Sequence, residues 1–350
     1  MDWTFLLFSA IKILAVFSIL MFFVAYVVLV ERRLSAVIQD RLGPNRVGPF
    51  GIWQPIADAV KAFLKEDFVP GHVRKAYYWL APAIVMMPAI LNVAIIPFGS
   101  NLGGQKMVIA DLNVGILYAF GIVSLGVYGI VLAGYAANSK YPFLGGIRSS
   151  AQMISYEVAM GLSVIPLFLL VGDLRLSQVV EQQAGTVKWL PFLPNWFVFQ
   201  SPMTAFSFVI FLGAAFAETN RTPFDLPEAE QELAGGYNVE YSSIKFALFF
   251  MGEYANMILA SAMMTTLFFG GWTLPVFGLD QVATTLWAGL AHIGIFLAKM
   301  GCFMVMFVWV RWMWPRFRYD QLMDLGWRQF IPIALGNIVV TAVWLWWQAK

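Results

Sequence analysis

Eight long apolar runs, each nearly free of charged residues, dominate this chain of 350 residues. A helix needs about 20 consecutive apolar residues to cross the hydrocarbon core of a bilayer. With 60% hydrophobic and 12% charged residues, the composition excludes a soluble enzyme, a disordered chain and a collagen-like fibre. The runs predict an all-α polytopic membrane protein with eight transmembrane helices, at about residues 5–30, 78–98, 112–138, 151–172, 197–217, 246–270, 282–310 and 329–347.

Lysine and arginine are distributed unevenly among the loops. Sixteen of the 22 basic residues fall in the odd-numbered loops, whereas four fall in the even-numbered loops or at the C-terminus. The positive-inside rule therefore predicts cytoplasmic odd-numbered loops and periplasmic termini. The first run is not expected to be a cleavable signal peptide, because it lacks a basic n-region and exceeds the usual h-region of about 7–15 residues. We expect a single membrane domain over residues 1–350.

Side chains that bind metals are scarce. Cys302 is the single cysteine, so a site of several cysteines for zinc or an iron–sulfur cluster cannot form. His72 and His292 lie in different kinds of segment, which makes a bis-histidine haem between membrane helices improbable. We therefore expect no metal and no covalently bound cofactor. His292 is expected to be a hydrogen-bonded packing residue in the seventh span.

The first cytoplasmic loop contains a short amphipathic segment. The first span is expected to end at Glu31, and two Gly-Pro steps within residues 41–49 then predict turns. Residues 52–65 have the period of a helix that is too short to span the bilayer and is expected to lie in the interface plane. Two interpretations are open. The helix is a surface anchor whose bases meet anionic headgroups, or it covers a cavity with Asp58 and Lys61 facing inward.

Several carboxylates lie within or beside the spans. Glu157 and Glu253 fall one to two turns inside the fourth and sixth spans, where an acid is usually paired, protonated or functional. The alternative is a protonated or arginine-paired acid that only holds helices together. Lys299 in the seventh span is a candidate for the cation of an ion pair or for a member of a proton path.

An acidic cluster follows the fifth span. Its members are Glu218, Asp225, Glu228, Glu230 and Glu232. Partly buried like charges raise one another's pKa values, so the cluster is expected to titrate as a coupled set. Arg221 is the only base between Glu218 and Asp225 and is the expected counter-ion. Asp225, three residues before Glu228, also predicts the start of a helix.

Four segments together resemble one family. They are ETNRTPFDL at 218–226 followed by NVEY at 238–241, the stretch 31–49, RSSAQMISYE at 148–157 and RFRYDQLM at 316–323. This order resembles the H subunit of the proton-pumping NADH:quinone oxidoreductases, respiratory complex I, whose mitochondrial counterpart is the first membrane core subunit. The resemblance covers nearly the whole chain and is collinear with the eight spans.

The resemblance implies a division of labour among subunits. Flavin, iron–sulfur clusters and NADH belong to other subunits of the complex, and the partners are those subunits, the bilayer and a quinone, ubiquinone or menaquinone, with no nucleic acid. The implied location is the bacterial inner membrane. Matching positions imply two sets of site residues. Those that line or flank the quinone chamber are Glu31, Arg32, Asp58, Lys61, Arg221, Asp225, Glu228, Glu230 and Glu232, and those that continue an acidic path into the bilayer are Glu157, Glu218 and Glu253.

One position departs from the family pattern. Ser124, in the third span, stands where some members of the family carry a glutamate, which puts in doubt any relay that requires a carboxylate there. Two alternatives remain at this point: the homologous membrane subunit of an energy-converting hydrogenase or formate hydrogenlyase, and a stand-alone proton-coupled transporter. A haem-bearing quinol oxidase subunit is nearly excluded by the histidine count.

Overall fold

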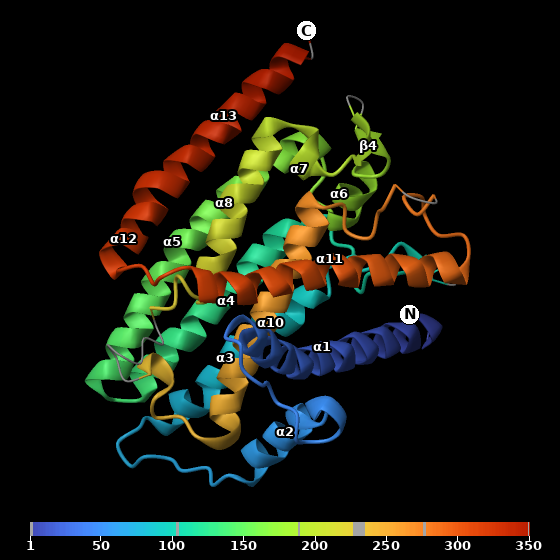
Figure 1. Cartoon of the computed structure of the whole chain (residues 1–350). Helices are drawn as coiled ribbons and strands as arrows, with labels where there is room; N and C mark the ends of the chain where they lie inside the picture. Colours follow the sequence, from blue (N-terminus) through green and yellow to red (C-terminus); the bar gives the residue numbers. More distant parts are fainter. Residues whose placement is uncertain (1–2, 103–104, 188–189, 227–234, 276–277, 349) are drawn as a thin grey trace.

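The structure is a computed structural model that describes residues 3–102, 105–187, 190–226, 235–275, 278–348 and 350. The structure consists mainly of long α-helices (Figure 1). In that view α5, α8 and α13 run steeply, whereas α1 and α11 run almost horizontally. The long helices are α1 (Trp3–Ile38), α3 (Lys75–Val93), α4 (Gly115–Ala136), α5 (Lys140–Val171), α10 (Ser243–Phe268), α11 (Leu286–Met313) and α13 (Ile331–Gln348).

Seven helices in the described part of the chain are long and apolar enough to cross a membrane. The predicted fifth span corresponds to α7 (Phe197–Gln200) and the apolar helix α8 (Pro202–Glu218), which has 17 residues. The predicted helical membrane fold is confirmed. The eight-span topology and the periplasmic termini stay predictions.

Two helices extend beyond the predicted spans. Helix α1 continues through Glu31 to Ile38, and α5 begins at Lys140, well before residue 151. A hydropathy run ends where polar residues begin, but polar and charged residues can continue the same helix beyond the hydrocarbon. The end of α5 agrees with the prediction, because Gly172 adopts the left-handed conformation (φ 72°) that terminates helices.

Shorter elements connect the long helices. The predicted amphipathic helix is confirmed as α2 (Gln54–Leu64). Two small antiparallel hairpins, which the sequence did not predict, pair β1 (Asn101–Leu102) with β2 (Gln105–Lys106) and β3 (Thr186–Val187) with β4 (Leu190–Pro194). The remaining elements are η1 (Pro49–Gly51), α6 (Leu176–Gln182), η2 (Gly236–Asn238), α12 (Tyr319–Asp324) and the π-helical η3 (Leu325–Phe330).

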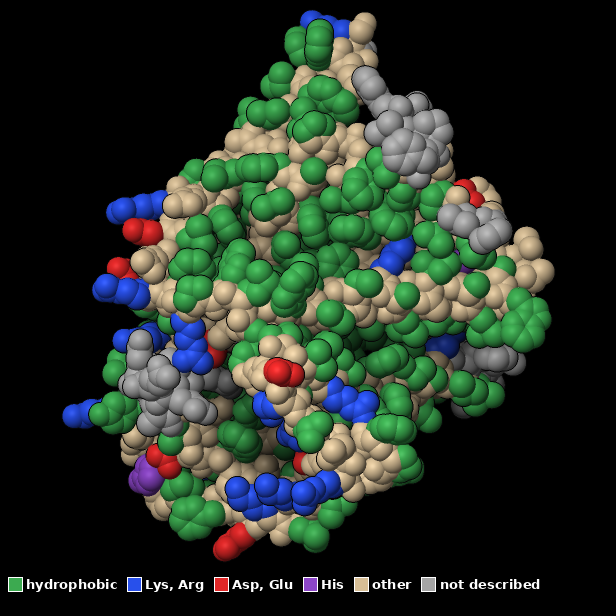
Figure 2. Space-filling model, viewed as in Figure 1, with side chains coloured by type: hydrophobic (Ala, Val, Ile, Leu, Met, Phe, Trp, Pro, Cys, Tyr) green, Lys and Arg blue, Asp and Glu red, His purple; other side chains and the backbone are tan. Residues whose placement is uncertain are grey.

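The core lies where α3, α4, α5, α8 and α10 pack together. Helices α3 and α4 approach closely at Gly129 of α4, where a Cβ atom would stand 2.6 Å from a methyl group of Val85 in α3. Tyr156 of α5 is fully buried, and its hydroxyl donates a hydrogen bond to the carbonyl of Leu322 at 2.9 Å. Figure 2 shows hydrophobic side chains over much of the visible surface, with most charges toward its lower and left parts, as expected for a lipid-facing protein.

Candidate functional site

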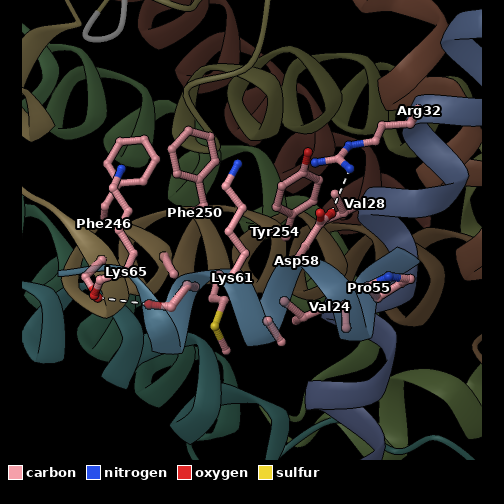
Figure 3. A pocket seen from close by; sticks show the side chains of 16 residues that line it. Val24, Val28, Arg32, Pro55, Asp58, Lys61, Lys65, Phe246, Phe250 and Tyr254 are labelled. Carbon is pink, nitrogen blue, oxygen red and sulfur yellow. Dashed lines mark hydrogen bonds and ion pairs between the residues drawn. The ribbon is translucent and has the colours of Figure 1, made fainter. Parts of the chain in front are cut away.

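A cavity of about 510 Å³ lies between α1, α2 and α10. Its walls are mainly apolar and include Val24 and Val28 of α1 and Phe246 and Phe250 of α10 (Figure 3). Lys61 points from α2 toward the cavity in this view. Large, largely apolar cavities with a few polar groups are typical of small-molecule sites.

The orientation of α2 decides between the two interpretations of the amphipathic helix. Its predicted apolar residues are exposed, namely Ile52, Trp53, Ile56, Val60, Phe63 and Leu64. Asp58 and Lys61 line the cavity instead. The helix therefore covers a cavity with its charged side, while its apolar side faces outward.

The preceding turn region brings α2 into place. Gly51 has a φ of 71°, and a Cβ atom there would stand 2.2 Å from the carbonyl oxygen of Pro44. Only glycine fits this close approach, which folds the loop back on itself just before α2. At the other side of the helix, Arg32 Nη1 of α1 lies 2.7 Å from Asp58 Oδ2. Both side chains are more than one-third exposed, so this ion pair contributes at most about 1 kcal/mol.

A second cavity of about 270 Å³ adjoins the first and shares Arg32, Phe250 and Tyr254 with it. In contrast to the first cavity, it is lined by charged side chains from four parts of the chain, which are Glu31, Arg32, Arg41, Arg221, Asp225, Glu253 and Arg311. An apolar cavity thus adjoins a compact ionic cluster.

Arg221 is at the centre of this cluster. Its Nη1 lies 3.1 Å from Glu31 Oε1, and its Nε lies 2.7 Å from Glu253 Oε1. The guanidinium also stands 4.5 Å from the centroid of the Tyr254 ring, and Arg221 is only 6% exposed. Burial alone lowers the pKa of Arg221, but the neighbouring carboxylates more than offset this effect and raise the pKa above its ordinary value. The predicted counter-ion therefore pairs directly with acids of α1 and α10, which are distant in sequence.

Asp225 has a different partner. Arg316 Nη2 lies 2.8 Å from Asp225 Oδ2, and Arg311 forms an ion pair with Glu31. Burial raises the pKa of Asp225, although Arg316 and Arg311 oppose the shift. The sequence did not single out Arg311 or Arg316 as site residues. Two features of the sequence could have indicated them. Arg311 follows directly after the predicted seventh span, and Arg316 begins the segment 316–323.

The acids inside the bundle lie deeper. Ser124 Oγ lies 2.5 Å from Glu157 Oε1 and 2.8 Å from the carbonyl oxygen of Phe120. Glu218 is buried, and its two carboxylate oxygens have no hydrogen-bond partner among the described residues. Two small cavities, of about 20 and 50 Å³, adjoin Glu218, and the first also touches Glu253. The first, which several polar side chains line, is large enough for one ordered water molecule, whereas the second is mainly apolar.

Lys299 makes a separate set of contacts. Its Nζ donates hydrogen bonds to the carbonyls of Phe269, Gly271 and Thr273 at 2.7, 3.0 and 2.7 Å. Its role in a proton path stays a prediction. His292 is confirmed as a hydrogen-bonded packing residue, because it is buried and its Nδ1 lies 2.8 Å from Ser100 Oγ.

Some predicted site residues lie outside the described residues. These are Glu228, Glu230 and Glu232, together with the helix expected to start after Asp225. Of the other predicted chamber residues, Arg32, Asp58 and Lys61 line the first cavity, and Glu31, Arg32, Arg221 and Asp225 line the second. Among the path acids, Glu253 belongs to the ionic cluster, whereas Glu157 pairs with Ser124.

Known proteins are similar to this sequence along nearly its whole length. A family model described as NADH dehydrogenase matches residues 11–342. An H subunit of NADH-quinone oxidoreductase from Cytophaga hutchinsonii is 47% identical over 344 residues, which cover 96% of each chain. The chain belongs to the family of NADH-quinone oxidoreductase H subunits. Two further members of this family agree: that of Rickettsia bellii is 49% identical over 96% of this chain and 93% of its own, and that of Flavobacterium psychrophilum is 45% identical over 99% of both.

Membership of the H-subunit family confirms the resemblance carried by the four sequence segments. The protein is a multi-pass membrane subunit of a translocase complex, and other subunits of complex I are its partners. This assignment replaces the two alternatives that the sequence left open, a hydrogenase subunit and a stand-alone transporter.

Proposed function

We propose that the two adjoining cavities form the membrane side of the quinone chamber of the complex. The observation that carries this proposal is that two cavities of different character adjoin. A mainly apolar cavity of about 510 Å³ shares three lining residues with a charged cavity of about 270 Å³. A quinone has an apolar tail and a polar ring that takes up protons on reduction. The first space suits the tail, and the second suits the ring.

The site residues have distinct roles in this proposal. Arg32, Asp58 and Lys61 flank the path of the quinone, and Glu31, Arg221 and Asp225 surround the position of its ring. Glu228, Glu230 and Glu232 follow Asp225 in sequence and are proposed to belong to the same acidic set. The chain acts as one membrane domain of the bacterial inner membrane and binds no metal of its own, while flavin, iron–sulfur clusters and NADH are handled by other subunits.

Coupling to proton translocation is proposed to be electrostatic. Reducing a quinone requires two electrons and two protons, and negative charge develops on the ring before the protons arrive. Two unit charges about 4 Å apart interact with an energy of about 4 kcal/mol at an effective dielectric constant of about 20. An energy of this size is enough to change which of Glu31 and Glu253 pairs more strongly with Arg221. It is also enough to shift the equilibrium of a neighbouring segment between two conformations.

The acids deeper in the bundle continue this path. The small cavity that touches both Glu218 and Glu253 supports a connection between these two acids through water, and Glu157 and Lys299 are proposed as further members of the path. Ser124 carries no carboxylate, so it acts in this scheme only as the hydrogen-bond partner of Glu157.

Filling the first cavity tests the chamber. Ala247 of α10 lines it, and Ala247→Phe is expected to raise the KM for quinone by about five- to 150-fold, because overpacking a site costs about 1–3 kcal/mol. NADH oxidation by a water-soluble acceptor should be unchanged. The measurement is steady-state kinetics of the complex in membrane vesicles.

The matched control for this substitution is Ala342→Phe, at an exposed position of α13. It introduces the same side chain away from the cavity and should leave the KM unchanged. An Ala247→Phe complex with normal quinone kinetics would contradict the chamber proposal.

A further inference from the structure

The C-terminal end of α2 is held by the beginning of α10. Ser243 Oγ lies 2.9 Å from the carbonyl oxygen of Ala62 and 3.0 Å from that of Lys65, so its single proton is shared between them. Ser242 Oγ donates to the carbonyl of Glu66 at 3.2 Å. The last carbonyls of a helix have no partners within it, and here a second helix supplies them.

An ion pair adjoins these hydrogen bonds. Lys245 Nζ lies 2.5 Å from Asp67 Oδ2 and 3.5 Å from the centroid of the Trp79 ring. Lys245 is only 4% exposed, whereas the side chain of Asp67 is 39% exposed. A buried ammonium group requires a partner, so Asp67 and the loop that carries it are fixed beside α10.

The backbone at this junction is strained. Ser243 has a φ of 54°, in the left-handed region that residues other than glycine rarely adopt. Such a conformation persists only where surrounding contacts determine it, and it is often found at functional sites. Here it accompanies the placement of the Ser243 hydroxyl against the end of α2.

The same junction borders the large cavity. Ser243 lines the cavity, and Phe246 and Phe250 of the following two turns form the wall opposite α2. The other attachment of α2, between Arg32 and Asp58, is half exposed and therefore weaker. The separation of the two walls thus depends mainly on the contacts at the end of α2.

We infer that Ser243, Lys245 and Asp67 form a latch that fixes α2 against α10 and thereby positions the cavity walls for quinone. This inference rests on the proposed function of the cavity. The three residues are positioning residues, because they act through α2 rather than through contact with the reacting atoms. Loosening the latch should impair binding more than turnover.

The test uses Asp67→Asn and Lys245→Gln in the whole complex, with Lys75→Gln as control. Lys75 is exposed at the start of the neighbouring α3. In both latch variants, backbone amides of residues 54–64 should exchange hydrogen at least about tenfold faster, and the KM for quinone should rise about three- to tenfold with kcat within about twofold. Lys245→Arg, which keeps the charge, should restore both values, and the control should change neither.

The outcomes separate the latch from the chamber. Unchanged exchange in α2 would overturn the latch whatever the kinetics. Faster exchange with an unchanged KM overturns the positioning role if Ala247→Phe still raises the KM. If Ala247→Phe is also without effect, the chamber proposal fails together with the positioning role. Should either charge variant prevent assembly, Ser243→Ala decides the matter, because it removes the hydrogen bonds to the carbonyls of Ala62 and Lys65 without leaving a charge unpaired.

Discussion

Replacing Arg221 with glutamine is expected to abolish quinone reduction and to lower the amount of assembled complex. The substitution removes the cation that pairs with the largely buried Glu253 and one of the two arginines that pair with Glu31. Removing one partner of a buried ion pair costs about 3–5 kcal/mol, which is a large part of the stability of a typical domain. The measurements are the content of the complex in membranes and the NADH:quinone activity per complex.

Two further variants control this prediction. Arg221→Lys keeps the charge but cannot reach two carboxylates with a planar group, so an intermediate loss is expected. Arg328→Gln removes an arginine whose side chain is 79% exposed and should have no effect. Full quinone activity in Arg221→Gln would show that the ionic cluster is dispensable.

Replacing Glu218 with glutamine is expected to decrease coupled proton translocation at least about tenfold. Glutamine has nearly the same shape but cannot release a proton, and positioned proton transfer typically contributes about 10²- to 10⁴-fold. Assembly should persist, because a neutral amide is easier to bury than a carboxylate. Glu157→Gln should act in the same direction. The measurement is acidification of inverted membrane vesicles per NADH oxidised.

The control for these variants is Glu181→Gln, at an exposed position of α6. It should pump normally. Electron transfer from NADH to a water-soluble acceptor should be unchanged in all three proteins. Normal proton pumping by both Glu218→Gln and Glu157→Gln would count heavily against an acidic path through the bundle.

Hydropathy and periodicity were sufficient to locate the long apolar helices but not to give their full extent. They predicted the apolar segments and the amphipathic α2, because each is encoded by neighbouring residues. They did not predict the continuation of α1 to Ile38, since hydropathy marks the segment within the hydrocarbon and not the end of the helix. They also did not predict the two short hairpins. The period of α2 showed that it has two faces. Which face meets the protein depends on α1 and α10, and the segment itself carries no information about them.

The sequence predicted most residues of the candidate site, but it did not predict which of them pair with one another. Arg221 was expected to neutralise acids near it in sequence, yet it contacts Glu31 and Glu253. Arg311 and Arg316 complete the cluster from the far end of α11 and the loop that follows. These pairs join residues far apart along the chain, so they follow from helix packing, which local sequence patterns do not specify.

Helix α2 turns its apolar side outward and its charged side toward the cavity. If the cavity is the proposed quinone chamber, this orientation places α2 between the acyl chains and the quinone, and the quinone is expected to enter the cavity from the lipid phase. Its availability is then set by its mole fraction in the membrane rather than by its aqueous concentration. Apparent affinities expressed per volume of water will therefore vary with the lipid-to-protein ratio of the preparation, even when the protein is unchanged.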